Sequence, residues 1–239
     1  MTSIKRTAPR AARARALVLF DARGAFTAVA ARPLWGVGVV VMLAFAVLPA
    51  LVFIARADTH AIVARELLRS GKLESIPADQ RDKIIDVGGK GMQVALPLAA
   101  AAKRSIWMTI VTMLCLALLK GSRPALAMAP VAGAVAIAMA PVALHDVFVA
   151  AVFVAKDPML LDATNAVLSN PAAWLGLDAG DTVAGALLRG LDFFQLWSCA
   201  LIGIGVNVVA GTRSSLPYGV AFGGHALATV FAALGPALR

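Results

Sequence analysis

Long apolar stretches constrain this chain more than any other feature. Four are strongly apolar and a fifth is interrupted by His145-Asp146; together they cover Leu34–Ala55, Ser105–Leu119, Ala125–Ala155, Phe193–Gly211 and Pro217–Leu238. A helix needs about 20 mainly apolar residues to cross a hydrocarbon core about 30 Å thick. Backbone amides inside lipid must bond within their own segment, so each stretch is a helix. The sequence predicts an all-α, polytopic transmembrane bundle of five spans.

Composition supports this class and limits the number of domains. The 239 residues are 60% hydrophobic and 15% charged, which is too apolar for an ordinary soluble domain. We expect a basic N-terminal segment over 1–33 and one membrane domain over 34–239. An extramembrane helical loop of about 56–91 follows the first span within that domain.

The net charge of +9 is concentrated partly before the first span. Asp21 is the one acid there, and the cations are Lys5, Arg6, Arg10, Arg13, Arg15, Arg23 and Arg32. A basic segment beside a membrane helix favours anionic lipid headgroups, and we expect no nucleic-acid partner. The positive-inside rule places the N-terminus in the cytoplasm and, after five spans, the C-terminus outside.

The loop after the first span predicts two short helices. Asp58 or Thr59 caps the first, which ends near Ser70-Gly71. The second starts between Ser75 and Asp79 and is broken by Gly88-Gly89. We expect this hairpin to pack on its own spans, and the alternative is a docking site for a partner.

The second span is short, at Ser105–Leu119, and basic residues precede it. We expect one helix that starts near Gly91 and emerges from the membrane around Arg104. Cations near an interface extend toward water. The alternative is that Lys103 and Arg104 contact lipid headgroups or another anion.

Several short motifs recur in a familiar order along nearly the whole chain, from Leu19 to Leu238. They are Leu19-Phe20, Ala25-Phe26, Arg32-Pro33-Leu34-Trp35, Pro77-Ala78-Asp79-Gln80, a Gly121 turn, Asn170-Pro171, the Leu191–Trp197 stretch and Leu201-Ile202-Gly203-Ile204-Gly205. In this order they resemble the bacterial branch of the Yip (Ypt/Rab-interacting protein) family. The resemblance implies five spans, a cytoplasmic N-terminus and a bacterial inner membrane location.

The functional content of this resemblance is small. Eukaryotic members are adaptors that recruit Rab-type GTPases through an aspartate-leucine-tyrosine-glycine-proline pattern in the cytoplasmic tail. The tail of this chain lacks that pattern, and Tyr218 is its single tyrosine. Rab binding therefore does not carry over, and the bacterial relatives imply a membrane protein of unassigned biochemical role.

Polar residues within the spans are candidate functional groups, because ionisable side chains are costly in hydrocarbon. The candidate intramembrane cluster consists of His145, Asp146, Asn207 and His225. If these converge, an imidazole and a carboxylate can relay protons or hold a metal. The competing interpretation is a structural hydrogen-bonded cluster or a helix end at the interface, and we predict no metal or other cofactor.

Small residues predict a helix-packing seam in the fourth and fifth spans. Its members recur every fourth residue and share a face: Cys199, Gly203, Asn207 and Gly211, then Gly219 and Gly223. Packing within the chain explains the seam most simply, and a homodimer is the alternative. Cys115 and Cys199 both lie in spans, so a disulfide framework is not expected.

The sequence as a whole favours a non-enzymatic membrane scaffold or accessory subunit that acts through helix packing and lipid contacts. No catalytic motif lies within a span, so an intramembrane enzyme is the weakest hypothesis. The alternative is a small transporter or channel in which His145, Asp146, His225 and Asn207 line a path. A membrane-protein partner or a homodimer is compatible with the first hypothesis.

Overall fold

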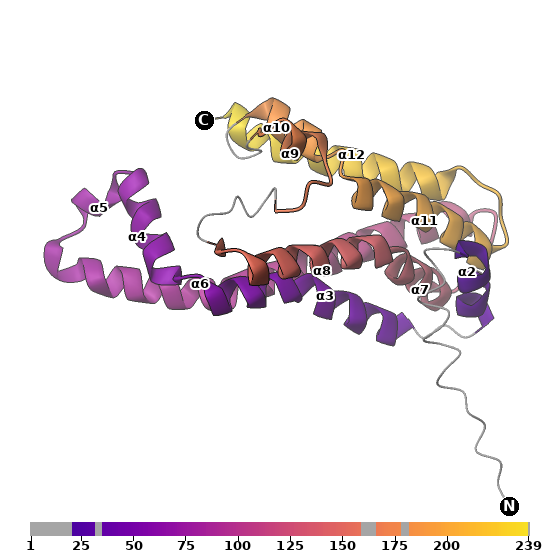
Figure 1. Cartoon of the computed structure of the whole chain (residues 1–239). Helices are drawn as coiled ribbons and strands as arrows, with labels where there is room; N and C mark the ends of the chain where they lie inside the picture. Colours follow the sequence, from indigo (N-terminus) through magenta and orange to yellow (C-terminus); the bar gives the residue numbers. More distant parts are fainter. Residues whose placement is uncertain (1–20, 32–34, 159–165, 178–181, 239) are drawn as a thin grey trace, which may run out of the picture.

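The described chain is a bundle of helices, and it confirms the predicted fold class. The structure is a computed structural model and describes residues 21–31, 35–158, 166–177 and 182–238. Within these ranges there is no strand, and the helices are α2 Ala22–Ala31, α3 Trp35–Arg56, α4 Thr59–Arg69, α5 Lys72–Ser75, α6 Ala78–Lys120, α7 Met128–Ala138, α8 Ala140–Ala155, α9 Pro171–Trp174, α10 Val183–Arg189, α11 Phe193–Ala210 and α12 Leu216–Ala237 (Figure 1).

Five of these helical segments are long and apolar enough to cross a membrane, with α7 and α8 counted as one. The chain is therefore a multi-pass integral membrane protein. The predicted first, fourth and fifth spans agree closely with α3, α11 and α12. In a long uncharged stretch the first polar or charged residue on each side marks the end of the span, which explains this agreement.

The third predicted span is correct in extent, but its break lies elsewhere. The sequence predicts the interruption at His145-Asp146, whereas the helix breaks at Met139 and both polar residues lie inside α8. Pro141 stands in the first turn of α8, where its missing N–H removes no helical hydrogen bond. Proline therefore sets the break, and the charged pair is accommodated within a helix.

The second span differs most from its prediction. α6 is one helix of 43 residues that begins at Ala78, runs through Gly88-Gly89 without a break and contains Pro97. At 1.5 Å per residue it is about 65 Å long, about twice a hydrocarbon core. The two glycines do not end the helix; they leave the space in which α4 packs against it. A Cβ on Gly88 would lie 2.9 Å from Val63, and one on Gly89 would lie 2.6 Å from His60.

The loop after α3 folds into an arm, by which we mean residues 57–92: α4, α5 and the first part of α6 (Figure 1). The predicted first loop helix is confirmed, since the Asp58 carboxylate caps α4 by accepting from the backbone N–H groups of His60 and Ala61 at 3.0 Å. Gly71, at φ 68°, turns the chain into α5. The arm thus extends the bundle along α6 and covers itself with α4.

A short helix ahead of the first span belongs to the bundle. The side chain of Phe26 in α2 is fully buried and lies against Gly205 of α11. Val29 of α2 lies against Gly133 of α7. Residues 1–20 and 32–34, with most of the predicted basic segment and the Leu19-Phe20 and Arg32-Pro33-Leu34 motifs, lie outside the described residues.

This contact yields a stability prediction. A Cβ on Gly205 would lie 2.6 Å from the Phe26 ring, so Gly205→Ala should lower the free energy of unfolding by about 1–3 kcal/mol through overpacking. Gly219→Ala is the control, because its Cβ would meet no described atom within 4 Å. The thermal unfolding midpoint in detergent measures both, and equal midpoints would contradict the packing of α2 on α11.

Candidate functional site

An ion pair between two helices is the strongest polar feature in the spans. The Arg104 Nη2 atom of α6 donates to the Asp146 Oδ2 atom of α8 at 2.8 Å. The side chains are 11% and 14% exposed, so the charges are largely removed from solvent. In such surroundings each charge depends on the other, because removing one partner leaves an uncompensated buried charge.

The depth of this pair follows from helix geometry. Arg104 is 16 residues from the end of α6 at Lys120, which is about 24 Å along the helix. In the other direction, Gln93 donates to Thr59 at the base of the arm, about 16 Å away. The pair therefore lies inside the apolar layer, toward the arm end.

The predicted headgroup residues have different environments. Arg104 has a protein partner, and its Nη1 atom is buried with no hydrogen-bond partner among the described residues. Lys103 is exposed and lies within electrostatic range of Arg104, Asp146 and Arg189. Headgroup contact thus stays a prediction for Lys103, whereas Arg104 is engaged inside the bundle.

The four residues of the candidate polar cluster have separate partners. The His145 ring lies 5.3 Å from the Phe194 ring at the start of α11, and Asp146 pairs with Arg104. The His225 Nε2 atom lies 2.7 Å from the Gly190 carbonyl oxygen. Each is used to join two segments of the chain, which agrees with the structural interpretation of these residues.

Asn207 organises the turn between α11 and α12. Its amide nitrogen donates to the Gly203 and Ser214 carbonyls at 2.9 and 2.8 Å. Its amide oxygen accepts from the Thr212 hydroxyl at 2.7 Å and the Ser214 N–H at 2.9 Å. All four hydrogen bonds are local, so Asn207 acts as a cap for the turn at the membrane end.

The predicted small-residue seam is divided. Cys199 and Gly203 face α12, since the Cys199 Sγ atom lies 3.5 Å from the Ala221 carbonyl and a Cβ on Gly203 would meet the Tyr218 ring. Gly211 ends α11 at φ 61°. Gly219 and Gly223 are exposed, so the prediction that they pack within the chain is wrong. Tyr218 and Ala221 supply the α12 face instead.

Hydrogen bonds between Ser169 and the start of α11 are a feature that the sequence did not predict. The Ser169 hydroxyl donates to the Asp192 carboxylate, and the Phe193 N–H donates to the Ser169 carbonyl at 2.9 Å. Asp192 also caps α11 by accepting from the Gln195 N–H at 3.0 Å. The pairing of Asp192 with a residue 23 positions earlier is visible only in the tertiary structure.

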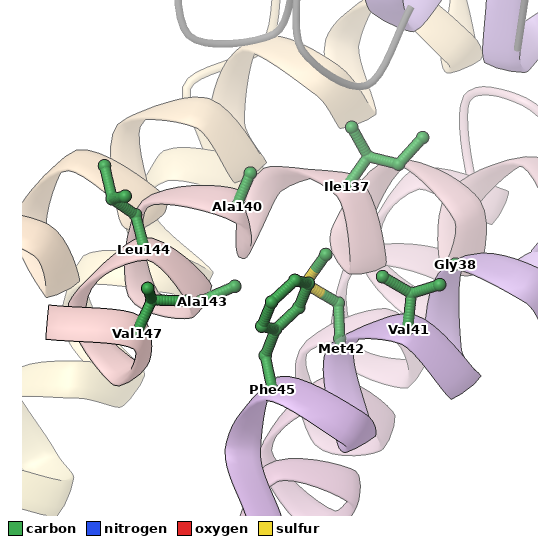
Figure 2. Close-up of a pocket in the computed structure, with 9 residues that line it drawn as sticks. All are labelled: Gly38, Val41, Met42, Phe45, Ile137, Ala140, Ala143, Leu144 and Val147. Carbon is green, nitrogen blue, oxygen red and sulfur yellow. The ribbon is translucent and has the colours of Figure 1, made fainter. Parts of the chain in front are cut away.

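An apolar pocket lies between α3, α7 and α8, at the helix break. Its volume is about 290 Å³, and it is lined by Gly38, Val41, Met42, Phe45, Ile137, Ala140, Ala143, Leu144 and Val147 (Figure 2). Every lining side chain is apolar, so the pocket fits hydrocarbon and offers no polar group to orient a substrate. Among the described residues no group of three or more His, Cys, Asp or Glu is placed to hold a metal ion.

Comparisons with protein-family models, curated proteins and solved structures find no match to this chain. The resemblance to the Yip family therefore stays a prediction. The site must be interpreted from its own geometry.

The ion pair yields a second prediction. Asp146→Leu should lower stability by about 3–5 kcal/mol, because it leaves Arg104 buried and uncompensated. Adding Arg104→Met should recover most of this loss, as an apolar pair of similar size replaces the charged one. The unfolding midpoint in lipid nanodiscs measures the effect.

The control for this series is Asp86→Asn on the arm, which breaks the exposed 2.7 Å pair with Lys90. It should change stability by about 1 kcal/mol or less. If the double variant is as unstable as Asp146→Leu alone, packing shape and not charge accounts for the loss.

Proposed function

We propose that this protein is a non-enzymatic membrane scaffold or accessory subunit of the Yip-family type. It acts through helix packing and lipid contacts, and its arm is the surface that meets a membrane-protein partner. The observation that carries this proposal is the length of α6, whose 43 residues extend about twice as far as a bilayer core is thick.

The composition of the arm suits a surface for protein contact. Its charges are of both signs, and Asp86 pairs with Lys90 and lies 3.4 Å from His60. Leu68 and Val87 are more than 60% exposed. A helical surface that mixes paired charges with exposed apolar side chains resembles the polar rim and apolar centre of protein interfaces.

The use of polar residues within the spans also supports the proposal. Arg104–Asp146, His225–Gly190 and the Asn207 turn each join segments of the same chain. Polar groups used in this way hold helices in register. A scaffold that presents a fixed surface depends on such bonds.

A small transporter or channel is the second candidate, and one observation favours it. Lys103, Arg104, His145 and Asp146 bring charge and an imidazole into the apolar layer, where ionisable residues commonly mark ion pathways. In that role Asp146 would exchange Arg104 for a transported ion or proton. Asn207 and His225 bond to groups outside this set and are not needed for this version.

The location in a bacterial inner membrane, with the N-terminus in the cytoplasm, is part of the proposal. Cys115 and Cys199 are buried, so an impermeant thiol reagent should report introduced cysteines alone. Ser70→Cys on the arm should be labelled in intact spheroplasts, and Ser122→Cys between α6 and α7 should require permeabilisation. The reversed pattern would invert the proposed orientation.

Partner capture tests the scaffold role. The tagged protein is extracted in native-lipid particles, lightly crosslinked and analysed for membrane proteins that co-purify. We expect a stoichiometric partner whose yield falls at least about tenfold when Leu68→Asp and Val87→Asp are combined, as loss of about 1.4 kcal/mol of binding predicts. Both side chains are exposed, so the fold should persist.

The matched control is Lys72→Asp, which introduces an acid at the exposed tip of the arm without removing an apolar contact. Capture of the same partner at equal yield by all variants would contradict a role of the arm. A protein recovered alone, together with ion flux in proteoliposomes that Asp146→Asn abolishes, would replace the scaffold proposal by the transporter.

A further inference from the structure

Helices α3 and α8 pack side by side from the apolar pocket to the ends of both helices, and we call the line of contact between them the α3–α8 groove. Gly38 of α3 approaches Ala136 of α7, and the Phe53 ring of α3 lies 5.5 Å from the Phe153 ring of α8. Both contacts join residues whose numbers differ by about 100, so α3 and the α7–α8 pair run in the same direction. The two helices therefore reach the arm end of the bundle together.

A break in the helix and small side chains create the pocket at the lower end of this groove. α7 ends at Ala138 and α8 begins at Ala140, and Gly38, Ala140 and Ala143 leave space that Met42 and Phe45 only partly fill (Figure 2). Four of the lining side chains are only half-buried: Val41, Phe45, Leu144 and Val147. The pocket is therefore open to the surface of the spans, where it is reached from the hydrocarbon.

The upper end of the groove carries two cations. Arg56 is the last residue of α3 and Lys156 follows α8 directly, each three residues beyond the phenylalanine pair, and both are exposed. Two acids follow them in the sequence. Asp58 is engaged as the cap of α4, and Asp157 also has an interaction of its own.

The separation of cations and pocket matches one leaflet. Arg56 lies 11 residues beyond Phe45, and Lys156 lies 12 residues beyond Leu144, so each cation is about 17 Å along its helix from the pocket. Half of a hydrocarbon core is about 15 Å. A phosphate at the cations and the end of an acyl chain in the pocket are separated by this length.

We propose that the α3–α8 groove binds one phospholipid of the leaflet on the arm side. Its phosphate is held by Arg56 and Lys156, and one acyl chain passes the phenylalanine pair and ends in the pocket at the helix break. Cations attract headgroup phosphates, and a chain in a preformed apolar pocket gains van der Waals contacts that loose lipid lacks. This inference deepens the lipid-contact part of the proposed function and rests on that part alone.

The test uses the full-length protein, purified in detergent, delipidated and examined by native mass spectrometry. It is titrated with phosphatidylglycerol and, separately, with diacylglycerol that carries the same acyl chains. We expect one phosphatidylglycerol per chain to be retained more strongly than further copies. Because no partner protein is present, failure of this experiment is distinct from failure of partner capture.

Two sets of variants separate the chain from the phosphate. Ala140→Leu fills the half-buried pocket and should weaken both lipids about tenfold, against Ala226→Leu on the exposed face of α12 as control. Arg56→Gln with Lys156→Gln should weaken phosphatidylglycerol alone, against Lys120→Gln with Arg213→Gln at the opposite end of the bundle. The glutamine variants change exposed residues, so they remain informative if Ala140→Leu fails to fold.

Four results would overturn the proposal. The first is equal retention of phosphatidylglycerol by the glutamine variants and their control, because the phosphate would then lie elsewhere. The second is equal retention by Ala140→Leu and Ala226→Leu. The third is retention of detergent alone, and the fourth is a dimer that Ala140→Leu dissolves, which would assign the groove to a second copy of the chain.

Discussion

Close approach of small residues is the physical condition on which this bundle depends. Lipid tails are as apolar as the helix surfaces, so helices gain little from the hydrophobic effect and associate through van der Waals packing. Gly133, Gly203 and Gly205 let the side chains of Val29, Tyr218 and Phe26 sit directly on a neighbouring backbone. The same contact in the arm sets Val63 on Gly88. The ion pair and the caps then fix a register that packing has already made possible.

The polar residues in this apolar setting bond to specific backbone and side-chain groups. The His225 ring bonds to a backbone carbonyl, and Asn207 accepts from the Ser214 N–H in the turn before α12. Asp192 caps the start of α11 and also accepts from the Ser169 hydroxyl. Each removes an unsatisfied group that lipid would not solvate. Two side-chain atoms are exceptions, since Arg104 Nη1 and Ser198 Oγ are buried and have no hydrogen-bond partner among the described residues. One of these two atoms belongs to the Arg104–Asp146 ion pair between α6 and α8.

The class of the fold follows from the sequence because hydrocarbon thickness imposes a length on every span. The helix ends near Arg56, Asp192 and Ser70 follow from local capping chemistry. Local rules failed where a distant segment decided the outcome. Gly88-Gly89 looked like a helix end, but α4 fills the space they leave. His145 and Asp146 looked like one site because they are adjacent, yet on a helix neighbours point about 100° apart, toward Phe194 and Arg104. A contact between residues that are tens of positions apart cannot be predicted from the local pattern of a single sequence.

Because α6 is continuous, the arm and the membrane half of that helix are mechanically coupled. A force applied near Lys72 is transmitted to the bundle along α6, which is joined to α8 by the ion pair at Arg104. Pro97 lies between them and lacks the N–H that would bond the carbonyl of Gln93, so bending stiffness is lowest there. The same Gln93 ties the arm base to Thr59 through its side chain. The segment between the arm and the membrane part of α6 is therefore five residues long, 93–97, and contains both Pro97, where the helix is weakest, and Gln93, whose side chain restrains it.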